Sequence, residues 1–115
     1  MATYDRLPVY KECYDLLLLL FQFCGMMQRE YRYTLGEALK KELIALITDI
    51  FRANCSYRKK ELLAGAREHV EVTRLLIRLC HDLKQLPLKT YALASDRIEN
   101  ISKQLTAWER SCKDQ

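Results

Sequence analysis

Cysteine and histidine are the side chains of this sequence best suited to metal binding or nucleophilic chemistry. The 115 residues include five cysteines and two histidines. No two cysteines form a Cys-x-x-Cys pair, and the adjacent residues Cys80 and His81 point about 100° apart on a helix. His69 lies twelve residues before His81, a spacing that matches no zinc pattern. We therefore expect no metal ion and no cofactor.

Motifs for enzymatic catalysis are absent from the sequence. It contains no Gly-rich phosphate loop, no Gly-x-Ser-x-Gly and no His-Glu-x-x-His, and its three glycines are scattered. Glu68 and Glu71 have a spacing common on solvated helices, and neither this pair nor Glu37 with Glu42 resembles a di-iron site, which needs Glu-x-x-His on two helices. The sequence thus predicts a protein that is not an enzyme.

The cysteine count and the apolar stretches bear on the cellular compartment. The number of cysteines is odd and no signal peptide precedes them, which favours reduced thiols in the cytoplasm. The longest apolar stretch, residues 16–27, is interrupted by Gln22 and Gly25 and is shorter than the roughly 20 residues that cross a bilayer. We expect a cytoplasmic protein with no membrane partner.

Apolar periodicity predicts the elements that carry these residues. Four helices are expected, over residues 8–28, 35–55, 58–85 and 88–110. Thr34 and Glu37 have the spacing of a capping box at the start of the second helix. Ser56, or else Asn54, is expected to cap the third helix, and Pro87 to end it.

The chain length and the short connections predict a single domain, residues 1–115. Four helices of this length form an all-α fold, an antiparallel up-down-up-down four-helix bundle. The predicted inner seam of the third helix consists of Leu62, Ala66, His69, Thr73, Leu76, Cys80 and Leu83.

Apolar residues cover more helix surface than one bundle requires. In the first helix they form two ridges, and one partner helix cannot cover both; the second ridge is Tyr10, Tyr14, Leu17, Phe21 and Cys24. In the third helix an aliphatic arc extends beyond the seam: Val72, Leu75, Leu79 and Leu83. The apolar arcs of that helix together span about 220°, against roughly 100° on a typical surface helix. We infer a homo-oligomer, with a wider core as the alternative.

Positive charge is concentrated on the third helix. Of the net charge of +4, three units lie in residues 58–86, which contain seven basic and four acidic side chains. The basic residues fall on one stripe opposite the seam, a pattern that suits a phosphate backbone. The predicted nucleic-acid-binding residues are Arg58, Lys59, Lys60, Arg67, Arg74 and Arg78. The alternative is a solvated face that Glu71 partly neutralises.

Tyrosines in the predicted loops add a second possible contact with nucleic acid. Tyr31, Tyr33 and Tyr57 lie among basic residues. Such side chains either stack on bases or pack against the end of their own bundle.

Several strings, spread over nearly the whole chain, resemble a known family. They are Leu7-Pro8-Val9-Tyr10, Tyr14-Asp15-Leu16-Leu17, Arg29-Glu30-Tyr31-Arg32-Tyr33-Thr34-Leu35-Gly36-Glu37, Arg52-Ala53-Asn54, Arg74-Leu75-Leu76-Ile77-Arg78 and Ile101-Ser102-Lys103-Gln104-Leu105-Thr106-Ala107-Trp108. They are similar to the accessory variability determinant (Avd) of bacterial and phage diversity-generating retroelements.

This resemblance implies a homopentamer of four-helix bundles arranged as a barrel. Its basic surface would bind RNA or DNA and the reverse transcriptase of the element, and the protein would support mutagenic retrohoming without being the polymerase. Related bundles are encoded within intervening sequences of ribosomal RNA, so a general RNA-binding or ribosome-associated protein is an alternative. A bare oligomerisation module is another.

Overall fold

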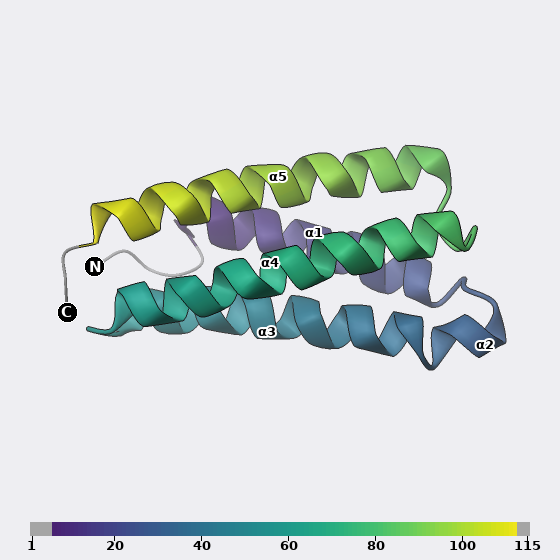
Figure 1. The fold of residues 1–115 in the computed structure, drawn as a ribbon, viewed down its shortest axis with the longest axis horizontal. Coiled ribbons are helices and arrows are strands. Elements are labelled where there is room, and N and C mark those ends of the chain that lie inside the picture. Colours follow the sequence, from purple (N-terminus) through teal and green to yellow (C-terminus); the bar gives the residue numbers. More distant parts are fainter. Residues whose placement is uncertain (1–5, 113–115) are drawn as a thin grey trace.

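The computed structural model describes residues 6–112, and this part of the chain is all helical, with no strand (Figure 1). Four helices are long and one is short: α1 (Pro8–Cys24), α2 (Arg29–Arg32), α3 (Leu35–Cys55), α4 (Lys59–Asp82) and α5 (Leu88–Ser111). The predicted all-α class is therefore confirmed. None of these helices is both long enough and apolar enough to cross a membrane.

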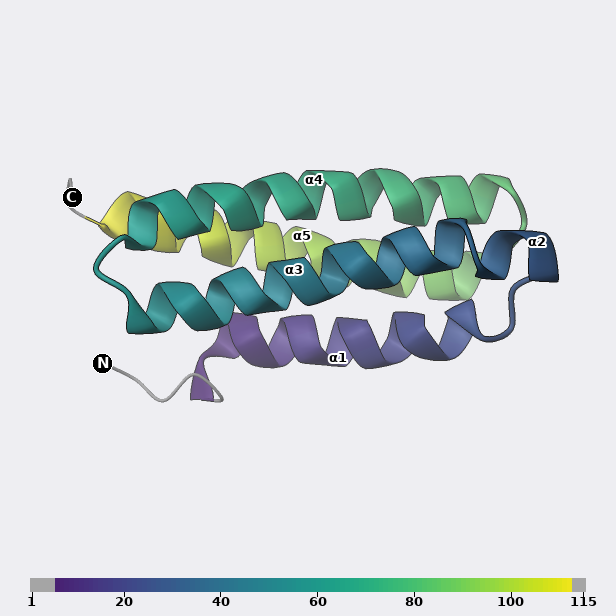
Figure 2. The same ribbon diagram turned by 90° about the horizontal axis from the view of Figure 1, so that it is seen from below.

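The four long helices lie side by side in a molecule of 44 × 23 × 21 Å. Helix α4 packs against α3 and α5, and α1 packs against the same two helices, so α1 and α4 lie on opposite corners. The α3–α4 connection is at the left end of Figure 1 and the α4–α5 connection at the right end, as the 90° view in Figure 2 also shows. This arrangement determines which surfaces face solvent.

The core is a continuous apolar seam along the inside of the four long helices. In α4 its buried residues are Leu63, Ala66, Val70, Thr73, Ile77 and Cys80. The predicted seam was wrong at four of its positions: Leu62, His69 and Leu76 are only half-buried, and Leu83 is exposed. The three half-buried residues each come one position before a buried one, and His69 contacts carboxylates of α3.

The first connection differs from the prediction. The helix expected over residues 8–28 ends at Cys24, and Gly25 to Gln28 lead into the short helix α2. The backbone N–H of Gln28 donates to Gln85 Oε1 at 2.8 Å, which joins this connection to the α4–α5 connection. The Gln85 side chain thus stabilises one end of the bundle.

The predicted capping box at the start of α3 does not form. The Thr34 hydroxyl instead donates to the carbonyl oxygen of Glu30 at 2.8 Å. Because α2 immediately precedes Thr34, this carbonyl lies one helical turn back and within reach. Ser56 accepts a hydrogen bond from the Arg58 backbone N–H at 2.9 Å, but Arg58, not Ser56, is the N-cap of α4.

Helix α4 ends at Asp82, three residues before the predicted end. Lys84 has a φ of 62°, in the left-handed region. The Gln85 N–H bonds to the Cys80 carbonyl at 2.8 Å, and the Lys84 N–H to that of His81 at 2.9 Å. This is the hydrogen-bond pattern of a Schellman motif, in which glycine usually occupies the left-handed position.

Candidate nucleic-acid interface

Helix α4 carries all six predicted contact residues, with Arg58 at its N-cap and the others within the helix. None of them belongs to the buried seam of α4. Arg67 and Arg74 contact acidic side chains of α5, whereas Lys59 contacts the end of α3.

Arg67 and Arg74 form ion pairs that join α4 to α5. Arg67 donates to Glu109 Oε1 at 2.5 Å, and Arg74 contacts Glu99 Oε1 at 2.6 Å and also Glu71. Burial lowers the pKa of Arg74, but its hydrogen bonds and charge interactions with the two carboxylates raise that pKa above its ordinary value overall. Carboxylates therefore neutralise much of the field that these two arginines present to solvent.

Arg58 and Arg78 are more available to a partner. Their side chains are 80% and 74% exposed, and their carboxylate contacts lie within α4, to Glu61 at 4.0 Å and Asp82 at 3.8 Å. Exposed pairs at such distances contribute little energy. A phosphate group can therefore replace either carboxylate at low cost.

Lys59 has a structural contact and Lys60 lies on the surface. The Lys59 ammonium donates to the carbonyl oxygens of Ala53 at 2.7 Å and Asn54 at 3.3 Å, in the last turn of α3. A cation at that position also complements the negative end of the helix dipole. Lys60 is exposed. That these six residues contact nucleic acid remains a prediction.

Two apolar surfaces accompany the basic side of the molecule. The first, which we call the α4 patch, is the aliphatic arc noted in the sequence; all four members are exposed: Val72, Leu75, Leu79 and Leu83. The second, the α1/α3 patch, consists of exposed Tyr14, Leu18, Ile44 and Phe51, with half-buried Tyr10, Leu17, Phe21 and Ile47 between them. Lys40 of α3 lies beside this patch, and its ammonium is 5.3 Å from the centroid of the Phe21 ring, which is a cation–π contact.

The two patches face different directions. The α1/α3 patch consists of residues of two helices that pack together, whereas the α4 patch belongs to α4, the helix diagonal to α1. Figure 2 shows the positions of these helices. The sequence showed the second ridge of α1, but it did not show that Ile44 and Phe51 of α3 would extend that ridge into a wider surface.

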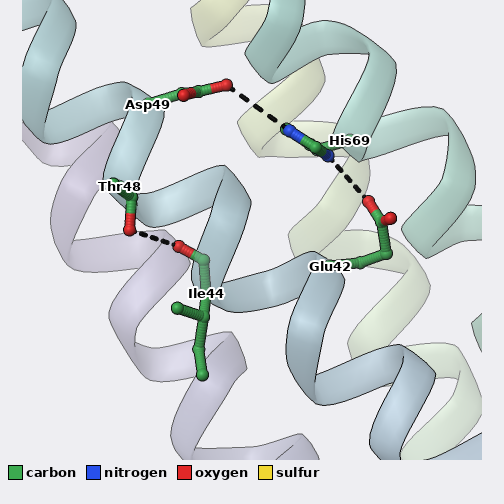
Figure 3. A network of polar contacts seen from close by, with 5 residues as sticks. All are labelled: Glu42, Ile44, Thr48, Asp49 and His69. Atoms are coloured by element: carbon green, nitrogen blue, oxygen red, sulfur yellow. Dashed lines mark hydrogen bonds and ion pairs between the residues drawn. The ribbon is translucent and has the colours of Figure 1, made fainter.

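A polar cluster joins α3 and α4 at His69, which the sequence placed in the inner seam (Figure 3). His69 Nδ1 lies 2.7 Å from Glu42 Oε2, and its Nε2 lies 3.5 Å from Asp49 Oδ2. Burial raises the pKa of Asp49, partly offset by the charges of His69 and Arg52. Because the two carboxylates contact opposite edges of the imidazole ring, the cluster bridges the helices. Within residues 6–112 no group of three or more His, Cys, Asp or Glu side chains could hold a metal ion.

The cysteine thiols are divided between the core and the surface. Cys13, Cys24 and Cys80 are fully buried, whereas Cys55 is exposed, and none of the five is in a disulfide. Burial raises the pKa of Cys13 to about 12, and burial together with the nearby Cys24 raises that of Cys80 to about 12. Cys13 and Cys80 are therefore neutral packing groups and not nucleophiles.

These features define a helical-bundle protein whose surface offers ion-pairing and apolar contacts. The model of the bAvd-like family matches residues 9–112, so the chain belongs to this family. The match confirms the resemblance seen in the sequence strings. No curated protein matches the chain.

Proposed function

We propose that this protein is the non-catalytic accessory protein of a diversity-generating retroelement. It binds the reverse transcriptase and nucleic acid, either template RNA or cDNA, and thereby supports mutagenic retrohoming. The observation that carries the proposal is the family match over residues 9–112. Holding enzyme and template on one scaffold raises the effective concentration of each for the other.

We further propose that the working form is a homopentameric barrel of antiparallel up-down-up-down bundles. Two distinct apolar patches on one chain favour a heterologous contact, in which the α1/α3 patch of one subunit covers the α4 patch of the next. Heterologous contacts form closed rings when the rotation between subunits closes. The family resemblance supplies the number five.

In this proposal, the exposed cations of α4 bind the phosphate backbone. Arg58, Lys60 and Arg78 are all exposed, and the ion pairs formed by the two arginines are long and within one helix. Such binding would be driven by counterion release and would depend strongly on salt, with little sequence preference. Arg67 and Arg74 would contribute mainly by fixing α4 against α5.

Charge reversal tests the nucleic-acid part of the proposal. The double variant Lys60→Glu with Arg78→Glu should weaken binding to labelled single-stranded RNA. It should also make the slope of log K against log salt concentration shallower by about 1.4, since each lost phosphate contact with a single strand accounts for roughly 0.7 of that slope. Arg74 is left unchanged because a glutamate there would face Glu71 and Glu99 and would disturb the α4–α5 contact.

The matched control is Lys103→Glu with Arg110→Glu, two exposed cations on α5 with the same total charge change. This control should retain most of the parental affinity and salt dependence. Equal losses in the two double variants would show that net charge matters and the α4 surface does not. Failure of the parent to bind RNA or DNA at low salt would contradict the proposal itself.

The reverse-transcriptase part needs a separate experiment. A reverse-transcriptase gene and paired template and variable repeats beside the gene for this chain would identify the enzyme to use. The purified enzyme should co-elute with this protein, and co-elution should persist after nuclease treatment. Elution of the two proteins in separate peaks would contradict that part of the proposal.

A further inference from the structure

A cleft of about 460 Å³ opens at the end of the bundle where α3 connects to α4. It lies where the start of α1, the end of α3, the start of α4 and the last turns of α5 meet (Figure 1). Its lining residues are Leu7, Asn54, Cys55, Ser56, Tyr57, Lys59 and Trp108. The cleft thus combines two aromatic side chains, a few hydrogen-bonding groups and one cation.

Tyr57 is the most informative residue of this cleft. Its side chain lies in the α3–α4 connection and is 95% exposed. Of the two alternatives for a loop tyrosine, packing against its own bundle is therefore excluded here. Because this ring is almost wholly exposed to water, a partner that covers it would gain most of the hydrophobic free energy that burying a tyrosine ring provides.

Trp108 provides a second aromatic surface. It comes from α5, is partly buried against the core, and lines the same cleft as Tyr57. Aromatic side chains with hydrogen-bonding groups between them are the usual composition of a site for a flat, partly polar ring.

Lys59 is the cationic residue among those that line the cleft, and two arginines are close to it in the sequence. Arg52 and Arg58 lie on either side of the α3–α4 connection, and both are exposed. The Lys59 ammonium donates hydrogen bonds to two carbonyl oxygens of α3, which holds this cation at the edge of the cleft. A ligand that suits this site has an aromatic ring for the cleft and negative charge for its rim.

We propose that this cleft binds one unpaired base of a single-stranded nucleic acid, stacked against Tyr57 and beside Trp108, with the flanking phosphates near Arg58 and Arg52. This inference depends on the proposed nucleic-acid binding and adds a strand preference to it. A base within a duplex is already stacked between its neighbours and cannot enter the cleft, whereas an unpaired base can.

The test compares Tyr57→Ala, Tyr57→Phe and the parent for binding to a labelled uridine 20-mer and to a duplex RNA of equal length. Tyr57→Ala should lose about tenfold in affinity for the single strand, because a stacked base contributes at least a factor of this order. Its affinity for the duplex should stay within twofold, and Tyr57→Phe should bind both RNAs like the parent. Tyr33→Ala is the matched control, since Tyr33 is also exposed, at 64%, and follows the basic helix α2 at the other end of the bundle.

Intrinsic fluorescence gives a direct view of the cleft, because Trp108 is the single tryptophan of the chain. Adding the uridine 20-mer should quench this fluorescence in the parent and in Tyr57→Phe, and less in Tyr57→Ala. If the parent binds RNA but Tyr57→Ala loses no affinity for the single strand, the cleft proposal fails and the proposed function remains. If the parent binds neither RNA, the proposed function fails as well.

Discussion

Glutamate substitution within each apolar patch should separate the proposed ring into monomers without unfolding the bundle. Leu18 in the α1/α3 patch and Leu75 in the α4 patch are the positions to change, since they are 51% and 63% exposed. Surface substitutions of this kind usually alter folding stability by less than about 0.5 kcal/mol. Helicity and the urea midpoint should therefore match those of the parent, and any effect on assembly arises at the contact.

The magnitude follows from the exposed fractions. Full burial of a leucine side chain contributes about 1.5–3 kcal/mol, so covering the exposed part of Leu75 contributes roughly 1–2 kcal/mol to the subunit contact. Burying an unpaired carboxylate in its place costs at least a few kcal/mol more. A total of about 4 kcal/mol corresponds to roughly a thousandfold weaker contact.

The assay is native mass spectrometry of each variant alone and of their equimolar mixture. Leu18→Glu and Leu75→Glu should each be a monomer of about 13.6 kDa, because each has lost one of the two surfaces that every subunit needs. The mixture should give a one-to-one dimer and nothing larger. In it the intact α1/α3 patch of the Leu75→Glu chain meets the intact α4 patch of the Leu18→Glu chain.

Leu93→Glu is the matched control. Leu93 is a 43% exposed leucine on α5 and belongs to neither patch, so this variant should assemble like the parent. The reasoning would be refuted if either patch variant formed a dimer by itself, because that result requires a patch that pairs with its own copy. It would also be refuted if the mixture of the two variants stayed monomeric.

Two further predictions concern stability. Lys84→Gly should raise the free energy of unfolding by about 1 kcal/mol, because glycine removes the strain of the left-handed backbone at φ 62°. The control Ala64→Gly, within α4, should lower the free energy of unfolding by about 1 kcal/mol. Urea titrations that give the same sign for both variants would contradict this prediction. The raised thiol pKa values predict an alkaline loss of stability: unfolded thiols ionise near pH 9, but Cys13 and Cys80 hold their protons to about pH 12, so unfolding releases protons above pH 9. Each thiol should cost about 1.4 kcal/mol at pH 10. Burial also raises the pKa of Cys24, which adds to this loss. Cys13→Ala should remove the contribution of one thiol, about 1.4 kcal/mol between pH 8 and pH 10, and an unchanged pH dependence would contradict the assignment.

Local patterns in the sequence were sufficient for much of the fold. The buried residues Ala94, Ile98, Ile101 and Leu105 of α5 are spaced at steps of three and four in the sequence, and such steps place them on one face of a helix whatever the neighbouring helices do. The predicted seam of α4 was less accurate. Two apolar rows lie side by side on that helix, and the sequence alone did not show which of them faces the core. In the structure His69 instead contacts Glu42 and Asp49 of α3.

The candidate site shows the same limit. The sequence located the basic stripe on α4, but the pairing of Arg67 with Glu109 and of Arg74 with Glu99 depends on the register between α4 and α5. The cleft beside Tyr57 brings together the start of α1 and the end of α5, which are about a hundred residues apart in the chain. The spacing of residues along the chain does not show that these two segments meet, so the cleft could be found only from the packed structure.

The central claim is a ring held by apolar contacts that binds nucleic acid through charge. Native mass spectrometry of the protein with a single-stranded RNA 20-mer, sampled from a low to a high ammonium acetate concentration, tests both parts in one titration. The account predicts pentamers with bound RNA at low salt and bare pentamers at high salt, because salt screens phosphate contacts but does not weaken apolar ones. Monomers at every salt concentration, or pentamers that never bind RNA, would contradict it.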